Sequence, residues 1–185
     1  MIIQLEGPDG SGKSTLAKLI RAKLIKNNIP FCYDNIENII PTKPTASHRL
    51  DKHALFKKMT QLAKDKRVYI LDRGAISDVV YRIFDDYKPI VSLPEIIEFF
   101  KKNNRRSFIV FCRTHLAEQK MLERGEDNPT SLNRHKELTK VYNLVEDCFR
   151  DKILMNIEHF DYSKNRPNHI IDSIIYWAKL VEDYE

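Results

Sequence analysis

The stretch from Gly7 to Ser14 reads GPDGSGKS and lies close to the start of the 185-residue chain. It matches the pattern G-x-x-x-x-G-K-[ST] in full. An apolar run, Met1–Glu6, precedes it and is expected to be a buried strand, while Leu16, Ile20 and Leu24 after it recur at helical spacing. A strand before the pattern and a helix after it are the context that a phosphate-binding loop requires.

The chemistry of this loop follows from its residue types. Glycines allow a tight backbone whose N–H groups can point inward at phosphate oxygens, and the start of the following helix adds positive potential. The lysine can reach the terminal phosphates, and the serine hydroxyl can ligate Mg²⁺. We therefore predict that MgATP binds at Gly7, Asp9, Gly10, Ser11, Gly12, Lys13, Ser14 and Thr15.

Strand and helix patterns alternate along the rest of the chain. Strands are expected at Met1–Glu6, Ile29–Tyr33, Val68–Leu71, Phe108–Cys112 and Ile153–Phe160. Helices are expected at Lys13–Lys26, His48–Lys64, Ser77–Phe84, Pro94–Lys102, His115–Arg124, Asn133–Phe149 and Asn168–Glu182, with Asn35–Ser47 irregular. This alternation predicts an α/β fold of the P-loop NTPase type, with a five-stranded parallel sheet covered by helices on both faces.

Composition and charge narrow the class of protein. The chain carries a net charge of +5, is 42% hydrophobic, and has no linker or repeat that would divide residues 1–185 into more than one domain. No apolar run approaches the roughly 18 residues needed to span a bilayer, and no signal peptide is recognisable. Cys32, Cys112 and Cys148 are scattered and odd in number. They are typical of reduced thiols in a cytoplasmic protein.

A second motif, Asp72-Arg73, follows the third expected strand. A carboxylate at a strand end can hold Mg²⁺, directly or through water, or accept a proton from an attacking oxygen. A neighbouring arginine can bind a phosphate with two parallel hydrogen bonds. We therefore predict catalytic roles for Lys13, Asp72 and Arg73, and metal ligation by Ser14 and Asp72. The phosphate loop with this motif indicates an ATP-dependent kinase.

In these two segments the sequence resembles the thymidylate kinases, a family of P-loop nucleoside monophosphate kinases. EGPDGSGKST at residues 6–15 is similar to that family's opening, and its D-R-Y-x-x-S-x-x-x-Y stretch is matched by Asp72, Arg73, Ser77 and Tyr81. The resemblance implies that Arg73 holds the acceptor phosphate and Asp9 contacts the sugar hydroxyl. It also implies that Asp9, Phe56, Arg73, Ser77 and Tyr81 line the substrate site.

The resemblance also implies a lid that closes over the phosphates, here expected at about residues 124–134. Some family members carry a transition-state arginine in the phosphate loop, and others supply it from the lid. Because Pro8–Ser11 contains no arginine, Arg124 is the candidate, with Arg134 second. The stretch Gly125–Ser131 is polar and rich in turn-forming residues, as a mobile lid should be.

Departures from the family pattern leave the acceptor open. Gly74 replaces the first Tyr of the D-R-Y stretch, Thr42-Lys43-Pro44 lacks the Arg and Glu of an R-E-P motif, and no Arg follows Phe56 on its helix. The first expectation is transfer of the γ-phosphate of ATP to a dTMP-like deoxynucleoside monophosphate, in nucleotide biosynthesis. Alternatives are a deoxynucleoside kinase, a kinase acting on a hydroxyl in DNA, and a regulator that only binds ATP.

Partners follow from the same features. A small-molecule nucleotide is the expected partner, ahead of nucleic acid, and no membrane is expected. A homodimer is compatible with these features.

Overall fold

The computed structural model describes residues 1–35, 52–85, 91–114, 116–123, 125, 129–150, 157–161 and 167–183. Five parallel strands form one sheet in the order β2-β3-β1-β4-β5. The strands are β1 (Ile2–Glu6), β2 (Phe31–Asn35), β3 (Val68–Asp72), β4 (Ser107–Arg113) and β5 (Ile157–Asp161). The predicted five-stranded parallel sheet is confirmed.

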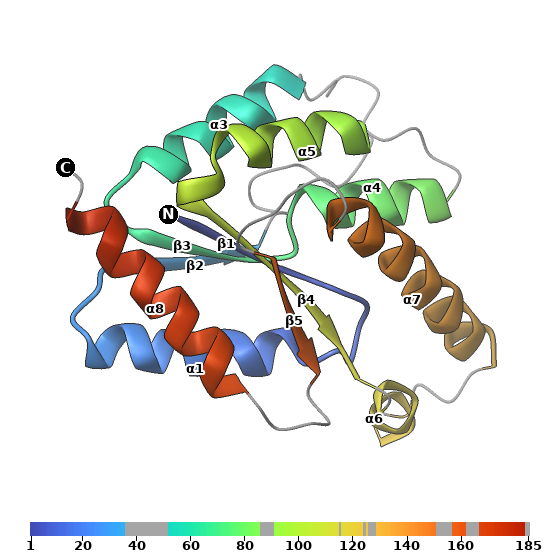
Figure 1. The fold of residues 1–185 in the computed structure, drawn as a ribbon. Coiled ribbons are helices and arrows are strands. Elements are labelled where there is room, and N and C mark those ends of the chain that lie inside the picture. Colours follow the sequence, from blue (N-terminus) through green and yellow to red (C-terminus); the bar gives the residue numbers. More distant parts are fainter. Residues whose placement is uncertain are drawn as a thin grey trace.

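Helices cover both faces of this sheet (Figure 1). One face carries α1 (Lys13–Lys26) and α8 (Pro167–Asp183). The other carries α3 (Lys52–Lys64), α4 (Ala75–Phe84), α5 (Leu93–Lys102) and α7 (Pro129–Arg150). A short helix, α6 (Ala117–Glu123), follows β4, and a 3₁₀ turn, Asn104–Arg106, precedes β4. The predicted α/β P-loop NTPase fold is therefore confirmed.

Alternation along β1 explains why the sheet has two separate cores. Ile3 and Leu5 are fully buried against the α1 and α8 side, where Leu16 and Ile174 also pack. Ile2 faces the opposite core. Successive side chains of a strand point to opposite faces, so Gln4 and Glu6 must point to the same side as Ile2. Both are buried, and a carboxylate there needs hydrogen-bond donors.

The element bounds differ from the expected ones in two informative places. β2 begins at Phe31 rather than Ile29, because it pairs with β3 from Phe31–Val68 to Asn35–Asp72. α7 begins at Pro129 rather than Asn133, so Thr130 and Ser131 are helical. Proline suits the first position of a helix, where its missing N–H would have no partner. Of the stretch Asn35–Ser47, which was expected to be irregular, Asn35 ends β2 and the remaining residues lie outside the described ones.

Candidate active site

The sequence motifs gather at one edge of the sheet, where the parallel strands end. The phosphate loop (Gly7–Ser14) leaves the carboxyl end of β1, and Asp72 with Arg73 ends the adjacent strand β3. β1 lies between β3 and β4. The chain goes from β1 to β2 and β3 on one side of it and then crosses to β4 and β5 on the other side, so the direction of the connections reverses at β1. Ligands of open α/β sheets bind outside the carboxyl ends of the strands at such a switch point.

All three glycines of the phosphate loop, Gly7, Gly10 and Gly12, have positive φ angles that other residues rarely adopt. Gly7 has φ 142°, and a Cβ there would lie 2.3 Å from the carbonyl oxygen of Cys112 on β4. Gly12 has φ 92° and forms the left-handed N-cap of α1. The glycine at position 7 therefore allows the loop to lie against β4, and the glycine at position 12 allows the sharp entry into the helix.

Lys13 lies inside this loop. Its side chain is only 6% exposed, and Nζ donates to the carbonyl oxygens of Gly7 at 2.8 Å and Pro8 at 2.7 Å. Burial, together with the nearby Arg73, lowers the pKa of the ammonium from 10.5 to about 8. A lysine held among backbone carbonyls at the centre of a phosphate loop suits an exchange of those carbonyls for phosphate oxygens.

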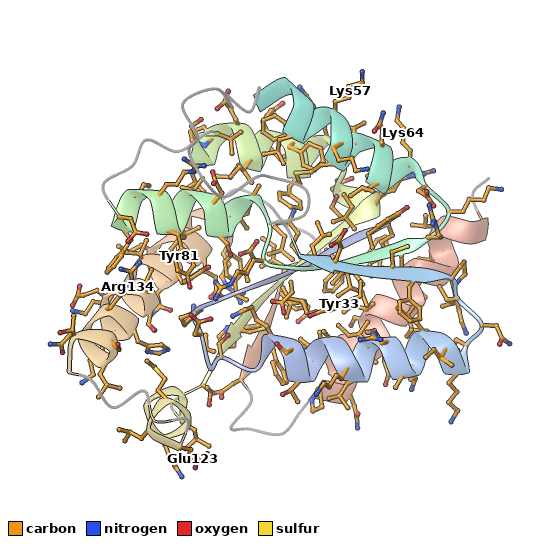
Figure 2. The ribbon with its side chains drawn as sticks, turned by 180° about the vertical axis from the view of Figure 1, so that it is seen from behind. Tyr33, Lys57, Lys64, Tyr81, Glu123 and Arg134 are labelled. Carbon is orange, nitrogen blue, oxygen red and sulfur yellow. The ribbon has the colours of Figure 1, made fainter. Side chains whose placement is uncertain are left out.

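Asp72 accepts hydrogen bonds from two other elements. Ser14 Oγ, at the start of α1, lies 3.4 Å from Asp72 Oδ2, and the Tyr33 hydroxyl of β2 donates to the same oxygen at 2.9 Å. Burial and the Asp72 carboxylate raise the pKa of Tyr33 to about 12. Tyr33 lies between β2 and α1 (Figure 2). No sequence pattern indicated this tyrosine, because it reaches the site only through the pairing of β2 with β3.

The guanidinium of Arg73 lies on the outer side of the phosphate loop. Nη2 donates to Asp9 Oδ1 at 2.5 Å, and Nη1 to the carbonyl oxygen of Gly7 at 3.2 Å. The group also lies over the ring of Tyr81, 4.8 Å from its centroid. The arginine side chain is 17% exposed and the Asp9 side chain 65%. The structure thus brings four predicted residues together around one cation: Gly7, Asp9, Arg73 and Tyr81.

A buried group of residues connects Arg73 to β1. We call it the Glu6 network, and it comprises Glu6, Arg73, Gly74, Ser77 and Tyr142. Glu6 accepts the Gly74 N–H at 2.7 Å and the Ser77 hydroxyl at 2.5 Å. The Ser77 hydroxyl lies 2.8 Å from that of Tyr142, which lies 3.4 Å from Arg73 Nη1. Burial raises the pKa of the Glu6 carboxyl from 4.5 to about 7, although these donors and Arg73 oppose the shift.

The sequence assigned no role to Glu6 or Tyr142. An acid at the end of an otherwise apolar strand was the available signal for Glu6, since such a residue needs a buried partner. Tyr142 lies in the middle of α7, 69 residues after Arg73. Nothing local to its helix marks it as part of a site.

Phe56 and Arg134 are placed differently from the other candidates. Phe56 stacks on Phe99 of α5 at 5.5 Å between ring centroids and packs against the core, so the structure gives it a packing role. Arg134 on α7 pairs with Asp85 at 2.6 Å and lies over the Phe84 ring, near Tyr81 (Figure 2). It therefore links α7 to α4. Arg124 lies outside the described residues.

A cleft of about 370 Å³ adjoins the phosphate loop on the α7 side. Residues of the loop, of the carboxyl ends of β4 and β5, and of α7 line it, including His135, Thr139 and Asn143. His135 Nε2 lies 3.0 Å from the carbonyl oxygen of Asp9 and so ties α7 to the loop. At the far end of the cleft, the buried Glu146 pairs with Arg113 and Arg150.

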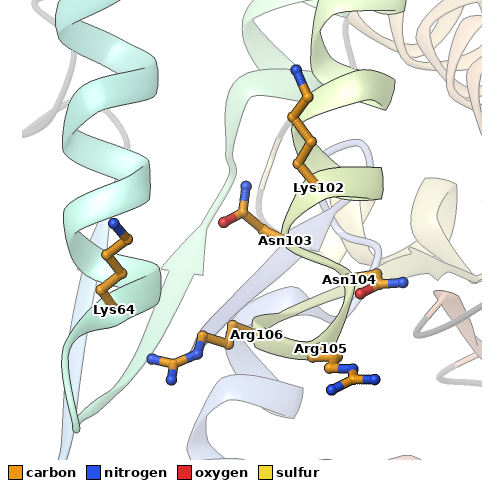
Figure 3. A pocket seen from close by; sticks show the side chains of 6 residues that line it. All are labelled: Lys64, Lys102, Asn103, Asn104, Arg105 and Arg106. Carbon is orange, nitrogen blue, oxygen red and sulfur yellow. The ribbon is translucent and has the colours of Figure 1, made fainter.

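A hollow of about 630 Å³ lies at the opposite end of the sheet, where the strands begin (Figure 3). It is lined by Lys64, Lys102, Asn103, Asn104, Arg105 and Arg106. Lys64 ends α3 and Lys102 ends α5. Cations at these positions complement the negative ends of the helix dipoles, which accounts for two of the four basic side chains without a ligand.

Neither a protein-family model nor a curated protein matches the chain. Among solved structures, the YorR protein of Bacillus subtilis, in complex with phosphorylated GDP, is similar with a TM-score of 0.67 and 20% identity, over 100% of this chain and 99% of that one. An uncharacterized protein from Eubacterium ventriosum has a TM-score of 0.56 and 17% identity, over 97% and 98%. Shikimate kinase from Aquifex aeolicus has a TM-score of 0.46 and 21% identity, over 100% and 98%.

These likenesses concern the fold. The first two agree with the sheet order and the loop geometry in giving an α/β P-loop NTPase fold. Within the part of the chain that is described, no helix is both long enough and apolar enough to cross a membrane.

Proposed function

We propose that the protein transfers the γ-phosphate of ATP to a deoxynucleoside monophosphate and releases the diphosphate and ADP. The observation that carries this proposal is the pair of cations at the phosphate loop. Lys13 lies inside the loop and Arg73 outside it, and both donate to the carbonyl oxygen of Gly7. One cation can hold the donor phosphates while the other holds a phosphate on the acceptor.

The reaction follows from this arrangement. An oxygen of the acceptor phosphate attacks the γ-phosphorus, the bond from that phosphorus to the β-bridging oxygen breaks, and ADP carries away the electron pair. A phosphate oxygen is already ionised at neutral pH, so no side chain has to remove a proton. Lys13 and Arg73 would hold the two phosphates in line, which is most of what phosphoryl transfer asks of a protein.

Mg²⁺ fits the oxygens at the end of β3. Ser14 Oγ and Asp72 Oδ2 lie 3.4 Å apart beside the loop. Mg²⁺ prefers oxygen ligands and is usually held by one or two protein groups together with substrate phosphates. When bound there, it would neutralise charge on the β- and γ-phosphates, with Ser14 as a ligand and Asp72 as a ligand directly or through water.

The site favours a monophosphate acceptor over a nucleoside. A nucleoside hydroxyl needs a general base within hydrogen-bond reach. Asp72 already accepts from Ser14 and Tyr33, and Asp9 pairs with Arg73. A dTMP-like pyrimidine remains the first acceptor to test, because the chain resembles thymidylate kinases in its phosphate loop and at Asp72, Arg73, Ser77 and Tyr81. Guanine nucleotides belong in the same test, since YorR was solved with phosphorylated GDP.

The experiment is an acceptor screen with γ-labelled ATP and Mg²⁺. Nucleosides, deoxynucleoside and ribonucleoside monophosphates, and single-stranded DNA are each offered to the purified protein. Label in a nucleoside diphosphate supports the proposal, and its dependence on Arg73 is checked with Arg73→Ala. Label only in monophosphates made from nucleosides, or only in DNA, replaces it with the corresponding alternative. ATP binding without transfer to any acceptor favours a regulator.

A further inference from the structure

We propose that Glu6 is a positioning residue, which holds the turn after β3 and the Arg73 guanidinium in the place that the acceptor phosphate requires. This inference rests on the proposed function and deepens it, because it names what controls the acceptor side of the site. Glu6 itself is fully buried, and its carboxylate accepts hydrogen bonds from Gly74 and Ser77. It would act only through Arg73.

The backbone of the turn after β3 is strained at Arg73. Arg73 has φ 70°, a left-handed conformation that an arginine rarely adopts. Two hydrogen bonds hold the turn against β1: the Arg73 N–H donates to the Leu5 carbonyl oxygen at 3.0 Å, and the Gly74 N–H donates to Glu6 Oε1 at 2.7 Å. The carboxylate is therefore a direct support of a strained backbone.

Gly74 shows how closely the turn approaches β1. A Cβ at this position would lie 1.8 Å from Gln4 Oε1 and 2.8 Å from Glu6 Oε1. The family pattern has a tyrosine here, and this chain has the residue that leaves room for the Gln4 and Glu6 side chains. The glycine at position 74, in place of the family's tyrosine, thus allows the contact of Glu6 with the turn.

The side-chain hydrogen bonds of the Glu6 network run in one direction, from Arg73 to Glu6. A guanidinium has only donors, so Arg73 Nη1 donates to the Tyr142 oxygen. The Tyr142 O–H is then free to donate to Ser77 Oγ, and the Ser77 O–H donates to Glu6 Oε2. Every side-chain donor in this series of hydrogen bonds thus points toward the ionised Glu6 carboxylate, which is the one member that has only acceptors.

Neutralising Glu6 breaks this order. A protonated carboxyl would donate to Ser77, and Ser77 would then donate to Tyr142. The Tyr142 O–H would no longer have Ser77 as its acceptor and would face the N–H groups of Arg73, which also donate. The consequence is a weakened hold on the guanidinium. The other titratable groups that face Glu6 are Lys13 and the buried Cys112 thiol, and neither takes part in these hydrogen bonds.

Glu146 provides a matched control on the same helix, α7, as Tyr142. Its side chain is 2% exposed, and it lies one turn after Tyr142 on α7. Its partners are Arg113, Arg150 and His159. Burial raises the pKa of Glu146, but the hydrogen bonds from His159 and Arg150 and the charge of Arg113 outweigh it and leave the pKa below the usual value. Glu146→Gln removes a buried carboxylate without touching the Glu6 network.

The kinetic test compares Glu6→Gln, Tyr142→Phe and Glu146→Gln, with dTMP or the acceptor that the screen identifies. Loss of a hydrogen bond to a charged group should raise the acceptor KM by at least about 10-fold in Glu6→Gln and Tyr142→Phe, with the KM for ATP within about twofold of wild type. Wild-type kcat/KM for the acceptor should fall as the pH drops through about 7. This fall should be smaller in Glu6→Gln than in Glu146→Gln.

A second measurement does not depend on any substrate. In the ¹³C NMR spectrum of carboxyl-labelled glutamate, one resonance should titrate near pH 7, disappear in Glu6→Gln and move in Tyr142→Phe. If no acceptor is phosphorylated by the wild type, the proposed function is wrong while this result still reports on the network. If acceptor KM is unchanged in both Glu6→Gln and Tyr142→Phe, or if Glu146→Gln raises it equally, Glu6 does not position Arg73.

Discussion

The two halves of the site are built in different ways. On the donor side, Gly7, Pro8, Ser11 and Lys13 contact one another within seven residues of sequence. On the acceptor side, Glu6, Arg73 and Tyr142 come from β1, the turn after β3 and α7, separated by 67 residues or more. The donor half can therefore form wherever its loop follows a strand, whereas the acceptor half exists only when three distant elements pack correctly.

The largest expected effect comes from breaking the donor half alone. Lys13→Ala removes the ammonium inside the loop, and kcat should fall by about 10³-fold, the upper end of the loss of about 10²–10³ that follows removal of one group that stabilises transition-state charge. The circular dichroism spectrum should stay unchanged, because the loop glycines set the backbone. Near-normal activity in Lys13→Ala would remove the assignment of the donor site.

The second-largest effect is expected in a third region, the predicted lid at about residues 124–134. Arg124→Ala should lower kcat by at least about 10²-fold with ATP affinity nearly unchanged, because a transition-state arginine is worth 10³-fold or more. Arg134→Ala is the comparison. Its guanidinium already pairs with Asp85 and Phe84, so we expect a smaller loss. Near-normal kcat in both variants would show that another residue stabilises the charge.

The third effect separates charge from geometry on the acceptor side. Arg73→Lys keeps the positive charge but cannot donate to Asp9, Gly7 and a phosphate from one planar group. The acceptor KM should rise by about 10-fold, which corresponds to roughly 1.4 kcal/mol, while the KM for ATP stays the same. Titration calorimetry with each nucleotide alone measures the two affinities separately. Equal losses for both nucleotides would mean that the two halves are not independent.

The same contrast explains what the sequence could predict. The donor half is a contiguous pattern, so its ligands could be proposed by residue, and Asp72 with Arg73 was visible because both follow an apolar strand. Glu6 could be noticed as an acid at a strand end, but its role, like the roles of Tyr33 and Tyr142, was not visible. These roles depend on strand pairing and on the contact of α4 with α7. Phe56 stacks on Phe99 and packs against the core, and its contact with a substrate stays a prediction.

The smallest effect is thermodynamic and concerns Glu6 alone. In the folded chain its carboxyl has a pKa of about 7, against 4.5 for an exposed glutamate. Between these values the folded state binds the proton that the unfolded state has lost, so wild-type stability falls as pH rises from about 4.5 to about 7. Function and stability thus favour opposite charge states of one residue, since the ionised carboxylate orders Arg73 but is costly to bury.

Glu6→Gln removes this proton linkage and leaves the others in place. The variant's melting temperature minus that of the wild type should therefore rise between pH 5 and pH 8, by on the order of 5 °C for a chain of this size. Glu146→Gln should give no such rise between pH 5 and pH 8, because the pKa of that carboxyl is lowered below 4.5 and its proton linkage acts only at lower pH. Thermal unfolding of the three proteins at matched ionic strength measures both slopes. Equal slopes for the two variants would mean that the two buried glutamates do not differ in charge state. The inference that an ionised Glu6 orders Arg73 would then lose its support.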